Sequence, residues 1–153
     1  QVSGYNMGFF TPAMLRRSIV SVTFDGTSGL GLAGSTTTFF TVTGEIQVLA
    51  LVPYVVATLT QSGATPTLAL GVVNSTALFI AATTATNLAI GEFWTEATGG
   101  GTANAGIALP AALKDIIITS NIVGTVGGTL NINGGTLRLT LFWLPVSADA
   151  AVA

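Results

Sequence analysis

Apolar and polar side chains alternate along this chain with a period of two, and no other feature constrains the fold as strongly. Near the C-terminus the odd positions 137–143 are all apolar, whereas the positions between them are Arg138, Thr140 and Phe142. Residues 18–24 alternate in the same way. Such alternation is typical of β-strands that bury one face. The sequence therefore predicts an all-β protein.

Further strand-like stretches lie at 36–43, 45–60, 67–73, 76–82, 116–123, 129–133 and 136–144. The stretch 45–60 is long enough for two strands, or for one strand bent at Pro53, because proline cannot donate to a central ladder. Asn74 and Ser75 are expected to turn a hairpin, and residues 133–135 (NGG) to separate the last two strands. Helix is expected only as one turn at 110–115, with 84–90 ambiguous. The glycine-rich stretch 99–106 is expected to be a flexible surface loop.

About eight short strands with turn signals between them predict a single antiparallel β-sandwich, and a jelly roll fits eight strands best. A chain of 153 residues suits one domain. We expect that domain to comprise residues 18–153. Residues 1–17 have no clean period and contain Gly4, Gly8 and Pro12, so they are expected to form an extended N-terminal arm.

The arm carries three aromatic side chains, Tyr5, Phe9 and Phe10, which it can hardly bury by itself. We expect them to anchor in pockets on a neighbouring subunit; the alternative is a terminal segment folded across its own domain. Arg16 and Arg17 hold half of the basic charge. They either pair with acidic groups on a partner or form a solvated pair where the domain starts.

The composition excludes several functions. Histidine and cysteine are absent. The chain therefore cannot form a zinc finger or a thiolate cluster, and it has no imidazole base for a Ser-His-Asp or Cys-His catalytic site. No enzyme, metal or cofactor is therefore expected. Four basic residues are too few for a nucleic-acid-binding surface. The densest apolar stretch, 48–57, is half as long as the ~20 residues that a membrane-spanning helix needs.

Charged residues make up only 7% of the chain, and hydrophobic residues make up 50%. A monomer of this composition exposes apolar patches and associates. Permanent interfaces are depleted in charge in the same way. The sequence therefore predicts a component of an assembly.

Two local motifs suggest chemistry and are better explained otherwise. Residues 29–34 (GLGLAG) match a dinucleotide-binding pattern, yet a strand-like stretch follows where that site needs a helix. Glu92 and Glu96 flank Trp94, but on a strand their carboxylates lie about 13 Å apart, too far for a glycosidase pair. Phe93 and Trp94 are expected to anchor a loop against the body or a partner.

The low charge, the threonine-rich and glycine-rich composition and three stretches, 17–24, 111–116 and 139–145, resemble the capsid cement (decoration) proteins of tailed bacteriophages. This resemblance implies a β-sandwich or jelly-roll subunit that forms dimers or trimers on the outer surface of the capsid. There it would bridge copies of the major capsid protein, and the resemblance implies no catalytic residues. The composition and the short apolar stretches add the expectation that the protein binds no cofactor, nucleic acid or membrane.

Two other classes remain open. A tail, baseplate or head-fibre module would bind host glycans through exposed aromatic and acidic side chains, for which Phe93 and Trp94 with residues 99–106 are the candidates. A non-viral assembly protein, such as a surface-layer or pilus subunit, would share the same composition.

Overall fold

The computed structural model describes residues 15–27, 29–61, 63, 65–102 and 106–153. Residues 1–14, which include Tyr5, Phe9 and Phe10, lie outside this part. The described chain is all-β, as predicted. Its strands are β1 (Arg16–Thr23), β2 (Thr36–Phe40), β3 (Val42–Thr43), β4 (Ile46–Gln61), β5 (Thr67–Val72), β6 (Ser75–Thr84), β7 (Glu92–Glu96), β8 (Gly99–Thr102), β9 (Ile116–Ile118), β10 (Ile122–Gly127), β11 (Ile132–Pro145) and β12 (Ala151–Val152).

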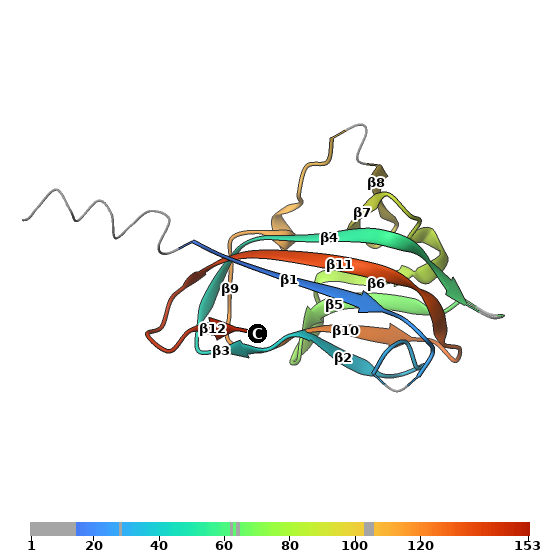
Figure 1. The fold of residues 1–153 in the computed structure, drawn as a ribbon, viewed down its shortest axis with the longest axis horizontal. Helices are drawn as coiled ribbons and strands as arrows, with labels where there is room; N and C mark the ends of the chain where they lie inside the picture. Colours follow the sequence, from blue (N-terminus) through green and yellow to red (C-terminus); the bar gives the residue numbers. More distant parts are fainter. Residues whose placement is uncertain (1–14, 28, 62, 64, 103–105) are drawn as a thin grey trace, which may run out of the picture.

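The long strands form two packed sheets (Figure 1). The larger sheet has the order β1-β11-β4-β7-β8, and β9 also pairs with β4. The smaller sheet has the order β2-β10-β5-β6, and the short strands β3 and β12 pair with each other. Helical structure among the described residues consists of the 3-10 turns η1 (Ala85–Asn87) and η3 (Ala111–Leu113), which match the two stretches where the sequence suggested helix.

The strand pairing is that of a jelly roll. β1 pairs with β11, β2 with β10, β4 with β7 and β9, and β5 with β6, always antiparallel. The first and the last long strands of the described chain thus pair with each other, and each later pair lies inside the previous one. A long hairpin rolled up in this way places alternate pairs in opposite sheets. The predicted β-sandwich with jelly-roll topology is therefore confirmed.

Alternation along each strand builds the core between the sheets. On β11, Leu137, Leu139 and Leu141 are fully buried, and Trp143 is nearly so. The positions between them point to the other side of the sheet and are exposed or half-buried. The same alternation on β1 buries Val22. Burial of one face of each sheet is what holds the two layers together.

β4 is one continuous strand, and Pro53 lies in its middle. On one side β4 pairs with β11 along most of its length. On the other side, its pairing with described residues is confined to residues 46–48 with β9 and to Tyr54 with β7. Pro53 therefore lies next to a local sheet edge, where a missing N–H breaks no ladder.

The expected turn at residues 133–135 is wrong, because β11 continues through it. The register with β4 is irregular here. Gly135 has a φ of 105°, and a Cβ on it would lie 2.6 Å from Leu59 Cα. The two glycines thus permit a close approach of two strands instead of reversing the chain.

Two expected boundaries also differ. Residues 99–102 form β8, which pairs with β7, so the expected loop is in part a strand; 103–105 lie outside the described residues. β1 begins at Arg16, so both arginines belong to the first strand and not to the arm.

Candidate docking surface

The face of the larger sheet that points away from the core is apolar and cationic. We call it the outer face. Its residues, taken from the alternation and the register, are Arg17, Ile19, Ser21 and Thr23 on β1, Thr136, Arg138, Thr140, Phe142 and Leu144 on β11, Ala50, Val52 and Tyr54 on β4, and Phe93 on β7.

Side chains on the outer face meet across the strands in rows. One row joins Ser21, Arg138, Tyr54 and Phe93. The guanidinium carbon of Arg138 lies 4.8 Å from the centroid of the Tyr54 ring, within cation–π range. The Tyr54 and Phe93 rings are 5.1 Å apart and tilted by 58°, a favourable aromatic geometry. Three strands thus hold one continuous stacked row on the surface.

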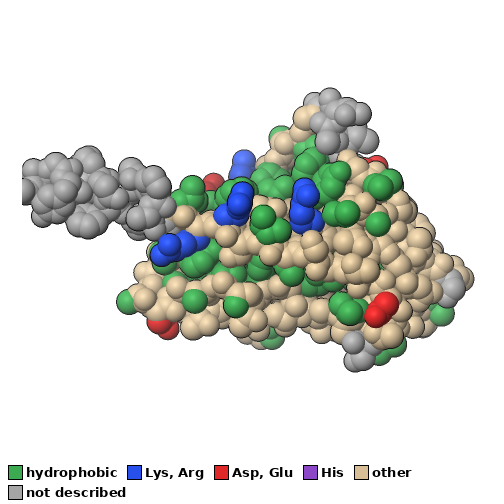
Figure 2. All heavy atoms as spheres, viewed as in Figure 1, with side chains coloured by type: hydrophobic (Ala, Val, Ile, Leu, Met, Phe, Trp, Pro, Cys, Tyr) green, Lys and Arg blue, Asp and Glu red, His purple; other side chains and the backbone are tan. Residues whose placement is uncertain are grey.

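The neighbouring rows are also partly apolar. Ile19, which is 52% exposed, aligns with Thr140 and Val52. Arg17 aligns with the half-buried Phe142 in the next row. Figure 2 shows Lys and Arg side chains gathered over β1 and β11, with hydrophobic side chains between them. Exposed apolar side chains that adjoin one another mark interaction surfaces more often than scattered ones do.

No outward position of these strands carries Asp or Glu. Within the described part of the chain, Arg17 and Arg138 have no carboxylate partner. The face therefore presents positive charge that nothing on its own surface neutralises. A complementary partner would be apolar and acidic.

The carboxylates lie elsewhere. Asp25 follows β1 in a turn, where its Oδ1 accepts a 2.6 Å hydrogen bond from the Thr27 hydroxyl. This bond, with a second one from the Thr27 N–H, holds the pKa of Asp25 below its usual value. Glu92 and Glu96 stand at opposite ends of β7, and Glu92 Oε2 accepts a hydrogen bond from the Ala89 N–H.

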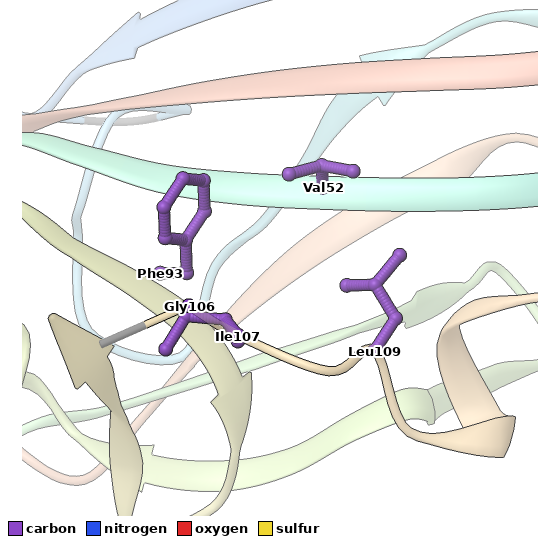
Figure 3. A pocket seen from close by; sticks show the side chains of 5 residues that line it. All are labelled: Val52, Phe93, Gly106, Ile107 and Leu109. Atoms are coloured by element: carbon purple, nitrogen blue, oxygen red, sulfur yellow. The ribbon is translucent and has the colours of Figure 1, made fainter. Parts of the chain in front are cut away.

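A pocket opens at the edge of the outer face, next to the stretch of β4 that has no pairing partner among the described strands on this side (Figure 3). It has a volume of about 460 Å³ and is lined by Val52, Phe93, Gly106, Ile107 and Leu109. Every described side chain that lines the pocket is apolar, so none of these residues can orient a polar ligand.

The structure separates the two aromatic residues predicted as partner contacts. Phe93 is half-buried on the outer face. Trp94 is fully buried in the core, because successive side chains of a strand point to opposite faces. The expectation that Trp94 contacts a partner or a glycan is therefore wrong, and the residue anchors β7 against its own body.

Arg16 and Arg17 are exposed on the edge strand of the larger sheet. Sequence reasoning missed Arg138, Tyr54 and Ile19 as surface residues of interest. The alternation places Arg138 on the face of its strand opposite the core, so the available signal is an arginine on the same strand face as Phe142. The partnership of Arg138 with Tyr54 depends on the register between β11 and β4, which alternation leaves open.

Within the described residues, no cluster of three or more His, Cys, Asp or Glu side chains could hold a metal ion. No helix in this part of the chain has the length and apolar character to cross a membrane. Comparisons with protein-family models, with curated proteins and with solved structures gave no match.

Proposed function

We propose that this protein is a structural subunit of a virion, a cement or decoration subunit that binds and stabilises the assembled head lattice of a tailed bacteriophage. The observation that carries the proposal is the outer face, on which Arg17 and Arg138 stand among apolar side chains without a carboxylate. In a chain with 7% charged residues, such a face is suited to a large, permanent contact with an apolar and acidic surface.

The proposed mechanism is stabilisation by mass action. A subunit that binds only the assembled lattice stabilises that lattice by its binding free energy. A dimer or trimer of this chain that engages several copies of the major capsid protein gains further affinity through avidity. On the lattice, Tyr5, Phe9 and Phe10 of the arm would reach a neighbouring subunit. This role requires no catalytic group or cofactor and places the protein on the outer surface of the capsid.

The structure gives less support to the alternative of a glycan-binding tail, baseplate or head-fibre module. Trp94 is in the core, which leaves Phe93 without its expected aromatic companion for stacking on a sugar. The described residues that line the adjoining pocket carry apolar side chains only, whereas sugar recognition needs polar groups that fix the hydroxyls.

The experiment that tests the proposal is the copy number of this chain in purified native particles, measured by quantitative mass spectrometry against the major capsid protein. One copy per shell subunit, or a simple fraction of it, supports a cement. A handful of copies per particle would point to a tail or fibre component, and absence from the particle would overturn the structural role.

A further inference from the structure

β1 is an unprotected edge of the larger sheet. It pairs with β11 in an unbroken register along its whole length and with no described strand on its other side (Figure 1). The edge strands β2, β6 and β8 each have an irregularity in their pairing. Proteins commonly protect a sheet edge with proline, charge or a bulge, and residues 18–23 of β1 have none of these. β1 is therefore a template for the addition of another strand.

The main-chain groups on the open side of β1 can be assigned. The N–H of Phe24, directly after β1, donates to the Gly135 carbonyl, so Phe24 points its main-chain groups towards the chain of β11. Every second residue of an antiparallel strand directs its N–H and C=O to the same side. The open side therefore presents the groups of the odd-numbered residues, which are Arg17, Ile19, Ser21 and Thr23.

We propose that the free protein is a dimer in which β1 pairs antiparallel with β1 of a second copy, across a twofold axis at Val20. In this register Ile19 lies opposite Ser21 of the partner subunit, and Arg17 lies opposite Thr23 of the partner subunit. All the open N–H and C=O groups of the two strands are then hydrogen-bonded to each other. A shift by two residues in either direction leaves some of them unpaired.

The charges around β1 favour a second copy of this chain as the partner. Arg16 and Arg17 stand at the start of β1, Asp25 follows two residues after its end, and all three side chains are exposed. Antiparallel pairing brings the arginines of each copy to the end of β1 where the other copy has Asp25. The two Arg17 residues lie about 20 Å apart along the strands, so their repulsion is screened. Such complementarity fixes the orientation of a contact.

Apolar side chains meet at the centre of the proposed contact. Val20 is half-buried at the margin of the core, and it faces its own copy across the axis in a non-hydrogen-bonded pair, the closer of the two pair types. On the outer face, Ile19 is 52% exposed and lies diagonally across from its own copy. The pairing thus covers both side chains at the middle of the edge.

The dimer also joins two outer faces into one surface. Ser21 ends the row that contains Arg138, Tyr54 and Phe93, and across the axis this row continues at Ile19 of the partner subunit. A head lattice that binds the dimer would then offer twofold-related apolar and acidic patches. This consequence rests on the proposed function, whereas the dimer of the free protein does not.

Cysteine trapping tests the pairing directly, because the chain contains no cysteine. Val20→Cys places the new thiol beside its own copy, in a pair whose Cα atoms lie about 4.5 Å apart, within the range of a disulfide. The matched control is Leu78→Cys, because Leu78 is also half-buried against the core on an edge strand, β6. Both full-length proteins are oxidised at the same concentration and analysed on non-reducing gels.

We expect a disulfide-linked dimer to form at least about tenfold faster with Val20→Cys than with Leu78→Cys, because the dimer holds the two thiols together. Ser21→Pro removes an N–H that faces the open side and leaves the ladder with β11 intact. Adding it to Val20→Cys should therefore remove the difference while the circular dichroism spectrum stays that of the folded protein.

Sedimentation of the cysteine-free wild type gives an independent result that does not depend on the folding of any variant. A twofold contact closes after two copies, so we expect a dimer. A wild type that sediments as a monomer or as a trimer would overturn the inference. Equal rates of cross-linking in the Val20→Cys and Leu78→Cys proteins, or an undiminished rate in folded Ser21→Pro, would overturn it as well.

Discussion

The indole Nε1 of Trp94 donates a hydrogen bond to Oγ1 of Thr83 over 2.9 Å, and both side chains are fully buried. Trp94 lies on β7 of the larger sheet and Thr83 on β6 of the smaller one. The Thr83 hydroxyl in turn donates to the Ala81 carbonyl over 3.0 Å. A polar link thus joins the two sheets inside an apolar core, where an unpaired donor would be costly.

Replacing Thr83 should therefore destabilise the protein out of proportion to the change in size. Thr83→Val keeps the shape but leaves the indole N–H without an acceptor, and we expect the free energy of unfolding to fall by about 1–3 kcal/mol. Thr83→Ser keeps the hydroxyl and is the control for the lost methyl group. Urea unfolding followed by tryptophan fluorescence measures both. A Thr83→Val protein as stable as the wild type would contradict this account of the link.

Gly124 on β10 lies against the ring of Phe39 on β2. A Cβ at position 124 would collide with Cζ and Cε2 of that ring, and Phe39 is only 5% exposed. Gly124→Ala should therefore force the ring from its site, at a cost of about 1–3 kcal/mol of unfolding free energy.

The collision itself can be isolated with a double-mutant cycle. Phe39→Leu alone removes part of the ring's packing and is destabilising. In that background Gly124→Ala should cost clearly less than in the wild type, because the ring atoms it strikes are gone. Strictly additive losses in denaturant unfolding would show that the two positions do not interact.

Asp25 should titrate below the usual range of a free aspartate. Its Oδ1 accepts hydrogen bonds from the hydroxyl and the main-chain N–H of Thr27, at 2.6 Å and 3.0 Å, and these lower its pKa. The pKa of Asp25 is lower in the folded protein than in the unfolded chain, so proton binding by Asp25 favours the unfolded chain. The contribution of Asp25 to stability is therefore fully present above its unfolded pKa and is lost as the pH falls through the folded pKa.

Thr27→Val removes the hydroxyl donor and keeps the N–H, so the pKa of Asp25 should rise towards its usual value. An NMR titration of the Asp25 carboxyl carbon measures this, with Thr38→Val, an exposed threonine on β2, as control. An unchanged titration in Thr27→Val would mean that the hydroxyl does not cause the shift.

Reversing one charge on the outer face tests the proposed docking surface. Arg138→Glu should weaken binding to purified phage heads by about tenfold or more, equal to about 1.4 kcal/mol, because it removes both the cation on Tyr54 and the charge that attracts an acidic partner. Lys114→Glu changes the net charge equally at an exposed position outside the outer face. Equal losses for both variants in a sedimentation assay would refute a specific role for Arg138.

The salt dependence of binding to phage heads is a second test of the outer face as the docking surface. Contacts that rest on Arg17 and Arg138 should weaken as ionic strength rises, since salt screens exposed charges. The Arg138→Glu protein should show a shallower dependence than the wild type. A wild-type affinity that does not change with salt would mean that apolar contacts alone bind the partner.

Local patterns in the chain were sufficient for the fold class and for most strands. The alternation predicted β1 and β11 and the face that each buries. This was possible because residues two apart on a strand share a face, so their polarity shows which face is buried. The β5–β6 hairpin expected about Asn74 and Ser75 is present, although its turn consists of Val73 and Asn74 and Ser75 already begins β6. The same turn chemistry failed at Gly134 and Gly135, where glycine serves a close strand approach. A glycine that reverses the chain in a turn and a glycine that lets two strands approach closely look identical in the sequence.

The sequence by itself thus determined an all-β sandwich with a charge-poor surface, since both follow from composition and from period-two alternation. Only the tertiary structure decided that Arg138 stacks on Tyr54, that Trp94 is buried beside Thr83 and that Pro53 lies at an open edge. Each of these depends on which distant strands pair, and in which register. A shift of one residue would turn each side chain to the other face of its sheet, and no local pattern fixes that shift.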